Sequence, residues 1–329
     1  MAPAAGFFWD YSAQKATPQE APALAKAKAA LGARLAHLMQ GGGRGFAEEY
    51  ERLSLVASSS QYTASEGASP PNAGRNRYRN ILPYDYNRVR LATVPEGGNY
   101  INASLVRSGG GESPPWCFIA SQGPLKGTVE DFWRMVLEQR CSAVVMLTQA
   151  FERRVEKCAP YFPQAKGSGA MVGRLQVCVE DLREVSTDIT VRAIRVSDPT
   201  TGMVSTVQHY HYHKWPDHGV PEFTKPLRDL INLLEATGAG RAPILVHCSA
   251  GVGRTGTFCA VYVLLQRLYA LLRSSRPSVG QIERAVDVPG VVARLRRQRM
   301  GMVQTVEQYY FCYQAVIQEV EAEMMRRGG

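Results

Sequence analysis

The chain has 329 residues, of which 45% are hydrophobic and 20% charged, so its length suits one large α/β domain with extensions or two small domains. Its 38 basic and 29 acidic residues give a net charge of +9, which favours anionic partners such as phosphorylated substrates, nucleic acid or acidic membranes without choosing among them. Since no run of about 18 apolar residues occurs and the N-terminus lacks the apolar core of a secretory signal, we expect no transmembrane segment.

The cysteines give a hint about the compartment. There are seven, an odd number, without regular spacing and without a CxxC pair. This pattern argues against a disulfide framework and against a zinc module. The sequence therefore predicts a reducing, cytoplasmic location.

The first predicted elements are helical. Residues 15–40 are rich in Ala, Lys and Leu, with leucines on one helical face, and the glycines at 41–45 end this helix. A second helix is predicted over 46–53. We therefore expect an Ala-rich helical extension over residues 1–40 and a main domain over 41–329. Within it, the Ser/Gly/Pro-rich stretches 57–75 and 107–115 are predicted to be a surface loop and a hairpin or insertion.

Strands and helices alternate through the rest of the chain. Predicted strands cover 99–105, 116–121, 142–148, 175–179, 188–196, 204–213 and 244–247, and predicted helices cover 129–138, 226–236, 255–272 and 306–325. The three strands between 175 and 213 are expected to be antiparallel. The mixture predicts an α/β or α+β fold with one core from about residue 46 to the end.

The chemical centre follows the strand at 244–247, which leads directly into Cys248. Between Cys248 and Arg254 lie only short side chains: Ser249, Ala250, Gly251, Val252 and Gly253. Small residues and glycines let the backbone curl so that successive N–H groups point inward, and the following helix adds partial positive charge at its N-terminus. A guanidinium matches two oxygens of a tetrahedral anion. The sequence therefore predicts a phosphate cradle with a thiolate nucleophile at its base.

The neighbours of this loop fit the same chemistry. Thr255 and Ser249 offer hydroxyl donors to the sulfur, and His247 can hold the strand end and the loop in register. The alternative is that Cys248 is an ordinary core cysteine in a strand-to-helix turn. A Walker-type nucleotide loop is disfavoured, because it would end in Gly-Lys-Ser/Thr.

The segment HCSAGVGRTG, residues 247–256, resembles the signature loop of the protein tyrosine phosphatase family, in its phosphotyrosine-specific branch. The resemblance implies a highly twisted mixed β-sheet flanked by helices. It also implies hydrolysis of phosphotyrosine in proteins through a cysteinyl-phosphate, without metal or cofactor, and a role in signal transduction. The implied partners are tyrosine-phosphorylated proteins or peptides.

Two further segments resemble catalytic loops of the family. Residues 215–221, WPDHGVP, resemble the mobile acid loop, with Trp215 at the hinge and Asp217 as general acid and then base. An aspartate by itself would more often be a turn residue. Residues 304–309, QTVEQY, resemble the glutamine loop, in which Gln304 orients the hydrolytic water and Gln308 assists.

Residues 76–85, NRYRNILPYD, resemble the substrate-recognition loop. There Tyr78 would stack on the phosphotyrosine ring and set the depth of the cleft, and Asn80 would hold the substrate backbone. Glu152 stands where the family has a carboxylate that pairs with the signature arginine, and Lys157 would lie near the acid loop. The local charge pattern of that segment equally fits a solvated hairpin.

Weaker signals remain. The alternating His209, His211 and His213 share one strand face, but no ligand cluster accompanies them, so a structural strand is favoured over a metal site. The basic run of Arg294, Arg296, Arg297 and Arg299 is read as a solvated helix face or as substrate attraction, and not as a nucleic-acid site.

Two rival functions stay open at this point. One is a phosphotyrosine-binding module without activity, although nucleophile, acid and arginine are all present. The other is a dual-specificity or phosphoinositide phosphatase, which the recognition-loop tyrosine and the uncharged signature loop disfavour.

Overall fold

The computed structural model describes residues 21–58, 62–92, 98–107, 117–216, 219–238, 242–272 and 278–328. Its helices are α1 (Ala21–Ser58), α2 (Ser65–Ala68), α3 (Val129–Glu138), α4 (Lys225–Ala236), α5 (Gly253–Leu272), α6 (Val279–Ala285), α7 (Val288–Gln298) and α8 (Val306–Gly328), with 3-10 turns at Pro70–Arg75 and Lys126–Thr128. Its strands are β1 (Arg88–Arg90), β2 (Tyr100–Arg107), β3 (Cys117–Ser121), β4 (Ala143–Met146), β5 (Phe151–Glu152), β6 (Val155–Glu156), β7 (Gly169–Val172), β8 (Leu175–Glu184), β9 (Ile189–Asp198), β10 (Met203–Tyr212) and β11 (Ile244–His247).

The described strands form one mixed sheet and one separate hairpin. The sheet order is β1-β2-β3-β11-β4-β10-β9-β8-β7, and β5 pairs with β6. The central strands β3, β11, β4 and β10 are parallel, whereas the strands toward both edges are antiparallel. This confirms the predicted α/β class and the antiparallel arrangement of the three strands between 175 and 213.

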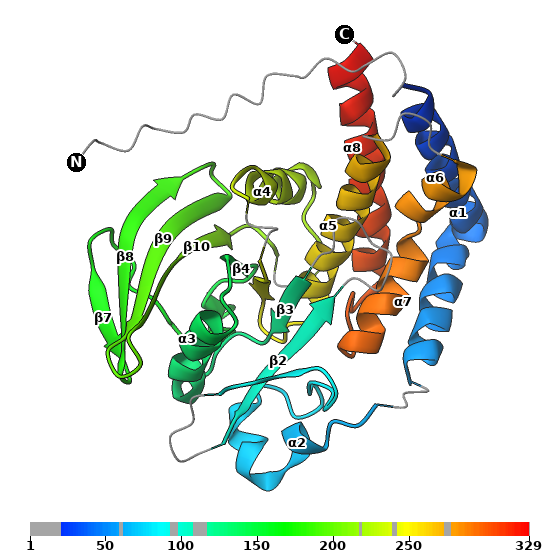
Figure 1. Ribbon diagram of the computed structural model, residues 1–329. Coiled ribbons are helices and arrows are strands. Elements are labelled where there is room, and N and C mark those ends of the chain that lie inside the picture. Colours follow the sequence, from blue (N-terminus) through cyan, green and yellow to red (C-terminus); the bar gives the residue numbers. More distant parts are fainter. Residues whose placement is uncertain are drawn as a thin grey trace.

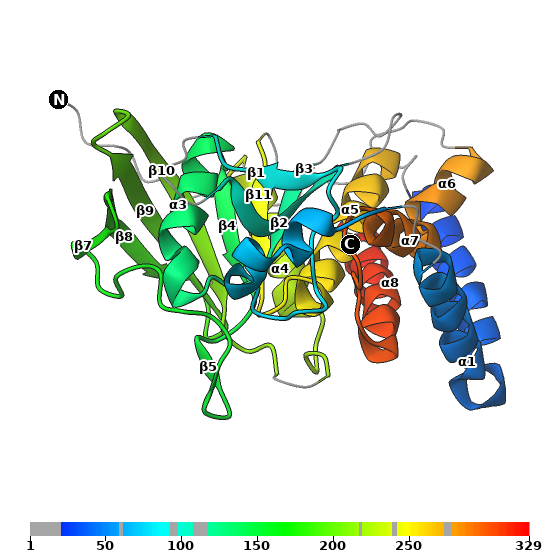
Figure 2. The same ribbon diagram turned by 90° about the horizontal axis from the view of Figure 1, so that it is seen from below.

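Two cores form because successive strand residues point to opposite faces of the sheet. On β11, Val246 joins the core made with α1, α5, α7 and α8, whereas Leu245 joins the core made with α3. Figure 1 and Figure 2 show α3 lying apart from the group of α1, α5, α7 and α8, which packs together. The centre of the sheet is therefore buried on both faces, as expected of parallel strands.

Helix α5 packs at the centre of the helical layer. Among the described residues it is the one helix that by length and composition could cross a membrane, but 83% of its most apolar window is buried inside the protein. Apolar residues all around a helix are also the pattern of a core helix.

The first half of α1, which was predicted to be a helical extension, packs against the main body of the protein. Leu24, Leu31 and Leu38 are buried in the same core as α5 and α8, and the chain leaves helical geometry at Gln40–Gly43, where the glycines predicted to end the first helix have positive φ. Residues 1–20 lie outside the described part, and the division at residue 40 stays a prediction.

Two Ser/Gly/Pro-rich stretches, 57–75 and 107–115, differ in how much of them the structure describes. The 57–75 stretch was predicted to be a loop, but its described part contains α2 and a 3-10 turn, because Asp85 accepts from the backbone N–H groups of Ser65 and Glu66 and so caps the short helix. The greater part of the 107–115 insertion lies outside the described residues.

Candidate active site

The nucleophile candidate lies at the carboxyl end of the central strand β11, where ligands of parallel sheets usually bind. Cys248 is 5% exposed, and its Sγ accepts a hydrogen bond from the N–H of Gly251 and another from Oγ1 of Thr255, both at 3.3 Å. The sulfur therefore sits beneath donors of the loop and of the first turn of α5. Thr255 is the hydroxyl donor that the sequence predicts, whereas the hydroxyl of Ser249, the other predicted donor, is hydrogen-bonded to that of Tyr78 instead.

The loop can curl this tightly because of Gly251. Its φ is +72°, and a Cβ there would lie 2.1 Å from the carbonyl oxygen of Ser121 on β3. The loop is also tied to the end of β3 by a bond from the N–H of Gly123 to the carbonyl of Ser249, at 2.9 Å. Only glycine at position 251 allows this approach.

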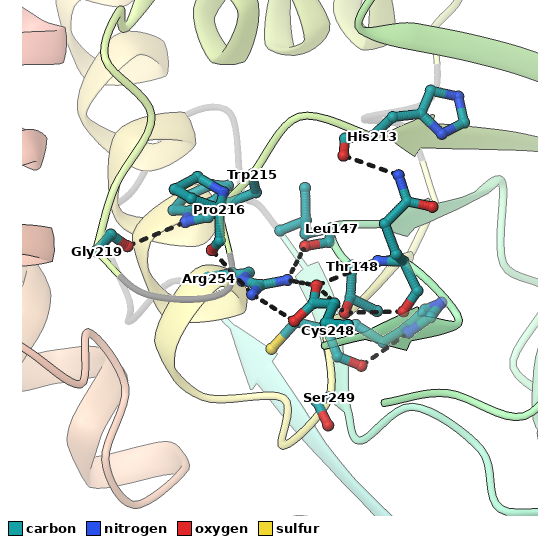
Figure 3. Close-up of polar contacts among 12 residues, drawn as sticks. Leu147, Thr148, His213, Trp215, Pro216, Gly219, Cys248, Ser249 and Arg254 are labelled. Carbon is teal, nitrogen blue, oxygen red and sulfur yellow. Dashed lines mark hydrogen bonds and ion pairs between the residues drawn. The ribbon is translucent and has the colours of Figure 1, made fainter. Parts of the chain in front are cut away.

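Arg254 is held beside the sulfur by an acidic partner. Its two terminal nitrogens lie 2.5 and 2.9 Å from the two carboxylate oxygens of Glu152. They also donate to the carbonyls of Leu147 and Pro216, as Figure 3 shows. A bidentate pair of this kind fixes the plane of the guanidinium. The hairpin β5–β6 thus carries a buried partner of the loop arginine, and the solvated-hairpin reading does not hold for Glu152.

His247 lies behind the loop in the core, where it is fully buried. Its Nδ1 is 3.2 Å from the carbonyl of Cys248, and its Nε2 is 2.8 Å from the hydroxyl of Tyr161. Because a carbonyl only accepts, Nδ1 carries the proton and Tyr161 donates to Nε2. Burial lowers the pKa of His247 to about 4, so it is neutral near pH 7 and fixes the end of β11.

Most of the predicted site residues line one cleft of about 420 Å³. Among the residues that line it are Tyr78, Asn80, Glu152, Lys157, Cys248, Ser249, Ala250, Gly253, Arg254, Gln304 and Gln308. The hydroxyl of Tyr78 is hydrogen-bonded to that of Ser249 at 3.0 Å, so the tyrosine stands at the wall of the cleft. Residues from four separate stretches of the chain, and Gly219 of the predicted acid loop, therefore line the same cleft as the sulfur.

The other predicted residues that the structure describes lie around this cleft. Gly251, Val252 and Thr255 are in the loop and in α5 beneath it. Trp215 is buried, and its Nε1 donates to the carbonyl of Gly219 at 3.4 Å, which ties one end of the predicted acid loop to the other. Asp217 itself lies outside the described residues.

The glutamine loop packs onto the start of α5. A Cβ on Gly253 would lie 3.0 Å from the side chains of both Gln304 and Gln308. The side-chain oxygen of Gln308 accepts from the N–H of Gln304 at 2.9 Å. The side-chain amides of both glutamines therefore lie against the N-terminus of α5, where the loop of residues 248–254 ends.

The prediction that the basic run is a solvated helix face or attracts substrate is wrong for two of its arginines. Arg299 is completely buried and donates to the carbonyls of Gly251 and Ala250, at 2.8 and 3.1 Å. Arg296 is 3% exposed and donates to the carbonyls of Met302 and Val303. The acceptors of Arg299 are 48 and 49 positions away in the sequence, and those of Arg296 lie in the segment that follows α7. The charge pattern of the run therefore could not show that these two arginines are buried.

The three histidines near the acid loop have partners in the fold. Their Nε2 atoms lie 2.6 to 2.9 Å from the Tyr161 hydroxyl, the Thr148 carbonyl and the Thr190 hydroxyl for His209, His211 and His213. In the part of the chain that the structure describes, no cluster of three or more His, Cys, Asp or Glu has the arrangement of a metal site. These contacts favour the structural interpretation of the strand.

A cysteine sulfur under converging N–H and hydroxyl donors, with a clamped arginine beside it, defines a cysteine-based phosphate-binding site on an α/β fold. The family model "protein-tyrosine phosphatase" matches residues 72–318, and the chain belongs to this family of phosphotyrosine hydrolases.

The curated relatives agree with this assignment. A protein-tyrosine-phosphatase PTP1 of Arabidopsis thaliana is 39% identical over 254 residues, covering 76% of this chain and 71% of the relative. A receptor-type tyrosine-protein phosphatase eta of Gallus gallus is 40% identical over 289 residues, covering 86% of this chain but 19% of the relative. A human phosphatidylinositol phosphatase PTPRQ is 40% identical over 276 residues, covering 83% of this chain and 11% of the relative. The chain thus spans most of the plant relative and a fifth or less of these two animal relatives.

Proposed function

We propose that this chain hydrolyses phosphotyrosine in proteins through a phosphate bound covalently to Cys248. The observation that carries the proposal is the sulfur at the floor of the cleft. It accepts hydrogen bonds from Gly251 and Thr255 and lies beside a guanidinium that Glu152 clamps. Donors that converge on a sulfur stabilise its anion, and the anion is the nucleophile.

In the first step, Sγ attacks phosphorus and the bond from phosphorus to the tyrosyl oxygen breaks. The leaving oxygen takes a proton from Asp217. Arg254 and the inward N–H groups of the loop bind the equatorial oxygens, where charge develops. The assignment of Asp217 rests on its position in the WPDHGVP segment.

In the second step, a water attacks phosphorus and the sulfur–phosphorus bond breaks, returning its electron pair to Sγ. Asp217, now ionised, takes the proton of the water, and inorganic phosphate leaves. Gln304 orients this water and Gln308 assists. Their contacts with the start of α5 support this role.

Selectivity for phosphotyrosine follows from the depth of the cleft. Cys248 is 5% exposed, whereas Tyr78 at the wall is 36% exposed, so a phosphate must reach past the tyrosine to the sulfur. An aryl phosphate is long enough, and its ring can stack on Tyr78. Asn80 lines the same cleft and can bind the substrate backbone, with less attraction than an aspartate would give.

The setting we propose is cytoplasmic signal transduction, with tyrosine-phosphorylated proteins as substrates. All seven cysteines are free, including the buried Cys248, which fits a reducing compartment.

The test compares phosphotyrosine peptide, phosphoserine peptide and phosphoinositide side by side with purified protein. We expect turnover of the first only, and Cys248→Ser should abolish it. Asp217→Ala should lower kcat by a factor of about 100 or more, the usual contribution of a general acid, while phosphopeptide binding is kept. Activity that persists in Cys248→Ser, or a preference for phosphoinositide, would overturn the proposal.

A further inference from the structure

The residue before Gln304 has an unusual backbone conformation. Val303 is completely buried with φ at +60°, in the left-handed region that β-branched residues avoid. The other described non-glycine residues with positive φ are all arginines, at positions 140, 153 and 154. Such a conformation persists only where the surroundings hold it, and it is found most often at functional sites.

The peptide unit that joins Val303 to Gln304 is held at both ends. Its carbonyl oxygen accepts from Nη2 of Arg296 at 2.8 Å and from the hydroxyl of Tyr50 at 3.1 Å. Its N–H donates to the side-chain oxygen of Gln308 at 2.9 Å. The plane of this peptide, and with it the direction of the Gln304 side chain, is therefore fixed by three side chains.

Arg296 connects this peptide to the N-terminal helix. Its Nε donates to the carbonyl of Met302 at 3.0 Å, and its Nη1 donates to Oγ of Ser54 on α1 at 2.9 Å. Its guanidinium lies 4.6 Å from the ring centre of Tyr50, also on α1. The second half of α1 thus supports the glutamine loop through two of its side chains.

On its other side the loop lies directly against the phosphate-binding segment. The N–H of Val303 donates to the carbonyl of Val252 at 3.2 Å, and a Cβ on Gly256 would lie 2.3 Å from the same nitrogen. Val303 has no room to relax toward α5. Release of its carbonyl on the α1 side would therefore rotate the peptide and turn Gln304 away from the cleft.

We propose that Tyr50 and Arg296 are positioning residues for hydrolysis of the cysteinyl-phosphate. They hold the strained Val303 and so aim Gln304 at the attacking water. The inference rests on the proposed role of Gln304. Through Tyr50, helix α1, which contains no catalytic motif, then contributes to the second chemical step, the hydrolysis of the cysteinyl-phosphate.

The test is rapid-mixing kinetics of Tyr50→Phe with p-nitrophenyl phosphate. This change removes one hydroxyl and keeps the ring under Arg296. We expect an unchanged burst rate of p-nitrophenol, which reports attack by Cys248. The following hydrolysis should be slower by about fivefold, the factor that one ordinary hydrogen bond is worth. Added methanol should capture a larger share of the phosphoryl group than in the unchanged protein, because water is no longer preferred.

Tyr86→Phe is the matched control, since it also removes a tyrosine hydroxyl bound to a backbone carbonyl, that of Arg297 on α7, the residue after Arg296, at 2.8 Å. It should change neither step. Arg296→Lys should slow the same second step more strongly than Tyr50→Phe does. Equal slowing of both steps, or no change in hydrolysis and methanol capture in either variant, would refute the inference.

Gln304→Ala separates this inference from the proposed function. If Gln304→Ala raises methanol capture but Tyr50→Phe and Arg296→Lys do not, the inference fails while the role of Gln304 stands. If Gln304→Ala itself leaves capture and hydrolysis unchanged, the proposed water-positioning role fails, and the inference fails with it.

Discussion

Arg299 donates from its Nε to the carbonyl oxygen of Gly251 at 2.8 Å, although the two residues are 48 positions apart. The same guanidinium reaches Ala250, the side-chain oxygen of Asn102 and the hydroxyl of Ser104. Two carbonyls of the phosphate loop, residues 248–254, therefore point outward to a buried arginine. The N–H groups of the loop are then free to point inward. Burial lowers the pKa of Arg299 to about 10, so it remains a cation near pH 7.

The first prediction concerns this arginine. Arg299→Lys keeps the charge but cannot reach four acceptors in a plane, so carbonyls of the loop lose partners. We expect the free energy of unfolding to fall by about 2–4 kcal/mol, since each buried unsatisfied group costs about 1–3 kcal/mol. Inhibition by inorganic phosphate should weaken as well. Urea unfolding and phosphate titration measure both effects.

Arg297→Lys is the control for that experiment, because Arg297 is exposed two positions away. It should leave both quantities unchanged. If Arg299→Lys behaves like this control, the arginine does not shape the phosphate loop.

The second prediction concerns the clamp on Arg254. Glu152→Gln keeps an acceptor for Thr148 Oγ1, which lies 3.0 Å away, but it places an amide donor against the guanidinium. Since a hydrogen bond to a charged group is worth about 1.5–3 kcal/mol, kcat/KM should fall by about tenfold or more. Steady-state kinetics measure this fall. Glu156→Gln, in the same hairpin but paired at 3.5 Å with Arg77, should have a much smaller effect. Equal effects of the two changes would contradict the clamp.

The third prediction concerns the hydroxyl donor to the sulfur. Thr255→Val removes the hydrogen bond to Sγ of Cys248 with little change of shape. The anion of the sulfur then loses a donor, so inactivation by iodoacetate or by mild peroxide near neutral pH should slow several-fold. Thr257→Val is the matched control, because its hydroxyl binds the carbonyl of Gly253 instead. Unchanged inactivation of Thr255→Val would show that this hydroxyl does not stabilise the thiolate.

The fourth prediction concerns acid stability. Burial lowers the pKa of His247 to about 4 and that of His211 to about 3, and it holds the pKa of His209 well below 6.5. The unfolded chain therefore binds more protons than the folded protein below about pH 6.5. Stability is complete above that pH and falls as the pH drops toward 4. The slope should approach about 1.4 kcal/mol per pH unit for each histidine.

Urea unfolding between pH 7 and 5 measures this slope before most carboxylates titrate. His211→Gln should reduce the slope by about one proton, whatever it does to stability at pH 7. His37→Gln should not, because His37 is exposed on α1. A flat stability profile across this range would mean that the buried histidines bind protons equally in the folded protein and in the unfolded chain.

Most regular elements could be predicted because their signals are local. The helix expected over 129–138 is α3, and the strand expected over 244–247 is β11. Their apolar periodicity and flanking residues lie within each segment. The short strands β1 and β7 were not predicted, since they have only three and four residues and no clear periodicity. Helix α6 was not predicted either, and α7 was anticipated only as the helix face suggested for the basic run. The arginines on and just after α7 were misread because a helix face is solvated or buried according to what packs on it.

The sequence by itself determined the chemistry of the phosphate loop, because strand, small residues, arginine and helix stand within a dozen positions and need only local geometry. The tertiary structure alone decided which distant groups hold that chemistry in place. Arg299 reaches Gly251 across 48 positions, and Tyr50 reaches Val303 across 253. Contacts of this kind depend on how whole elements pack, so no spacing along the chain could reveal them.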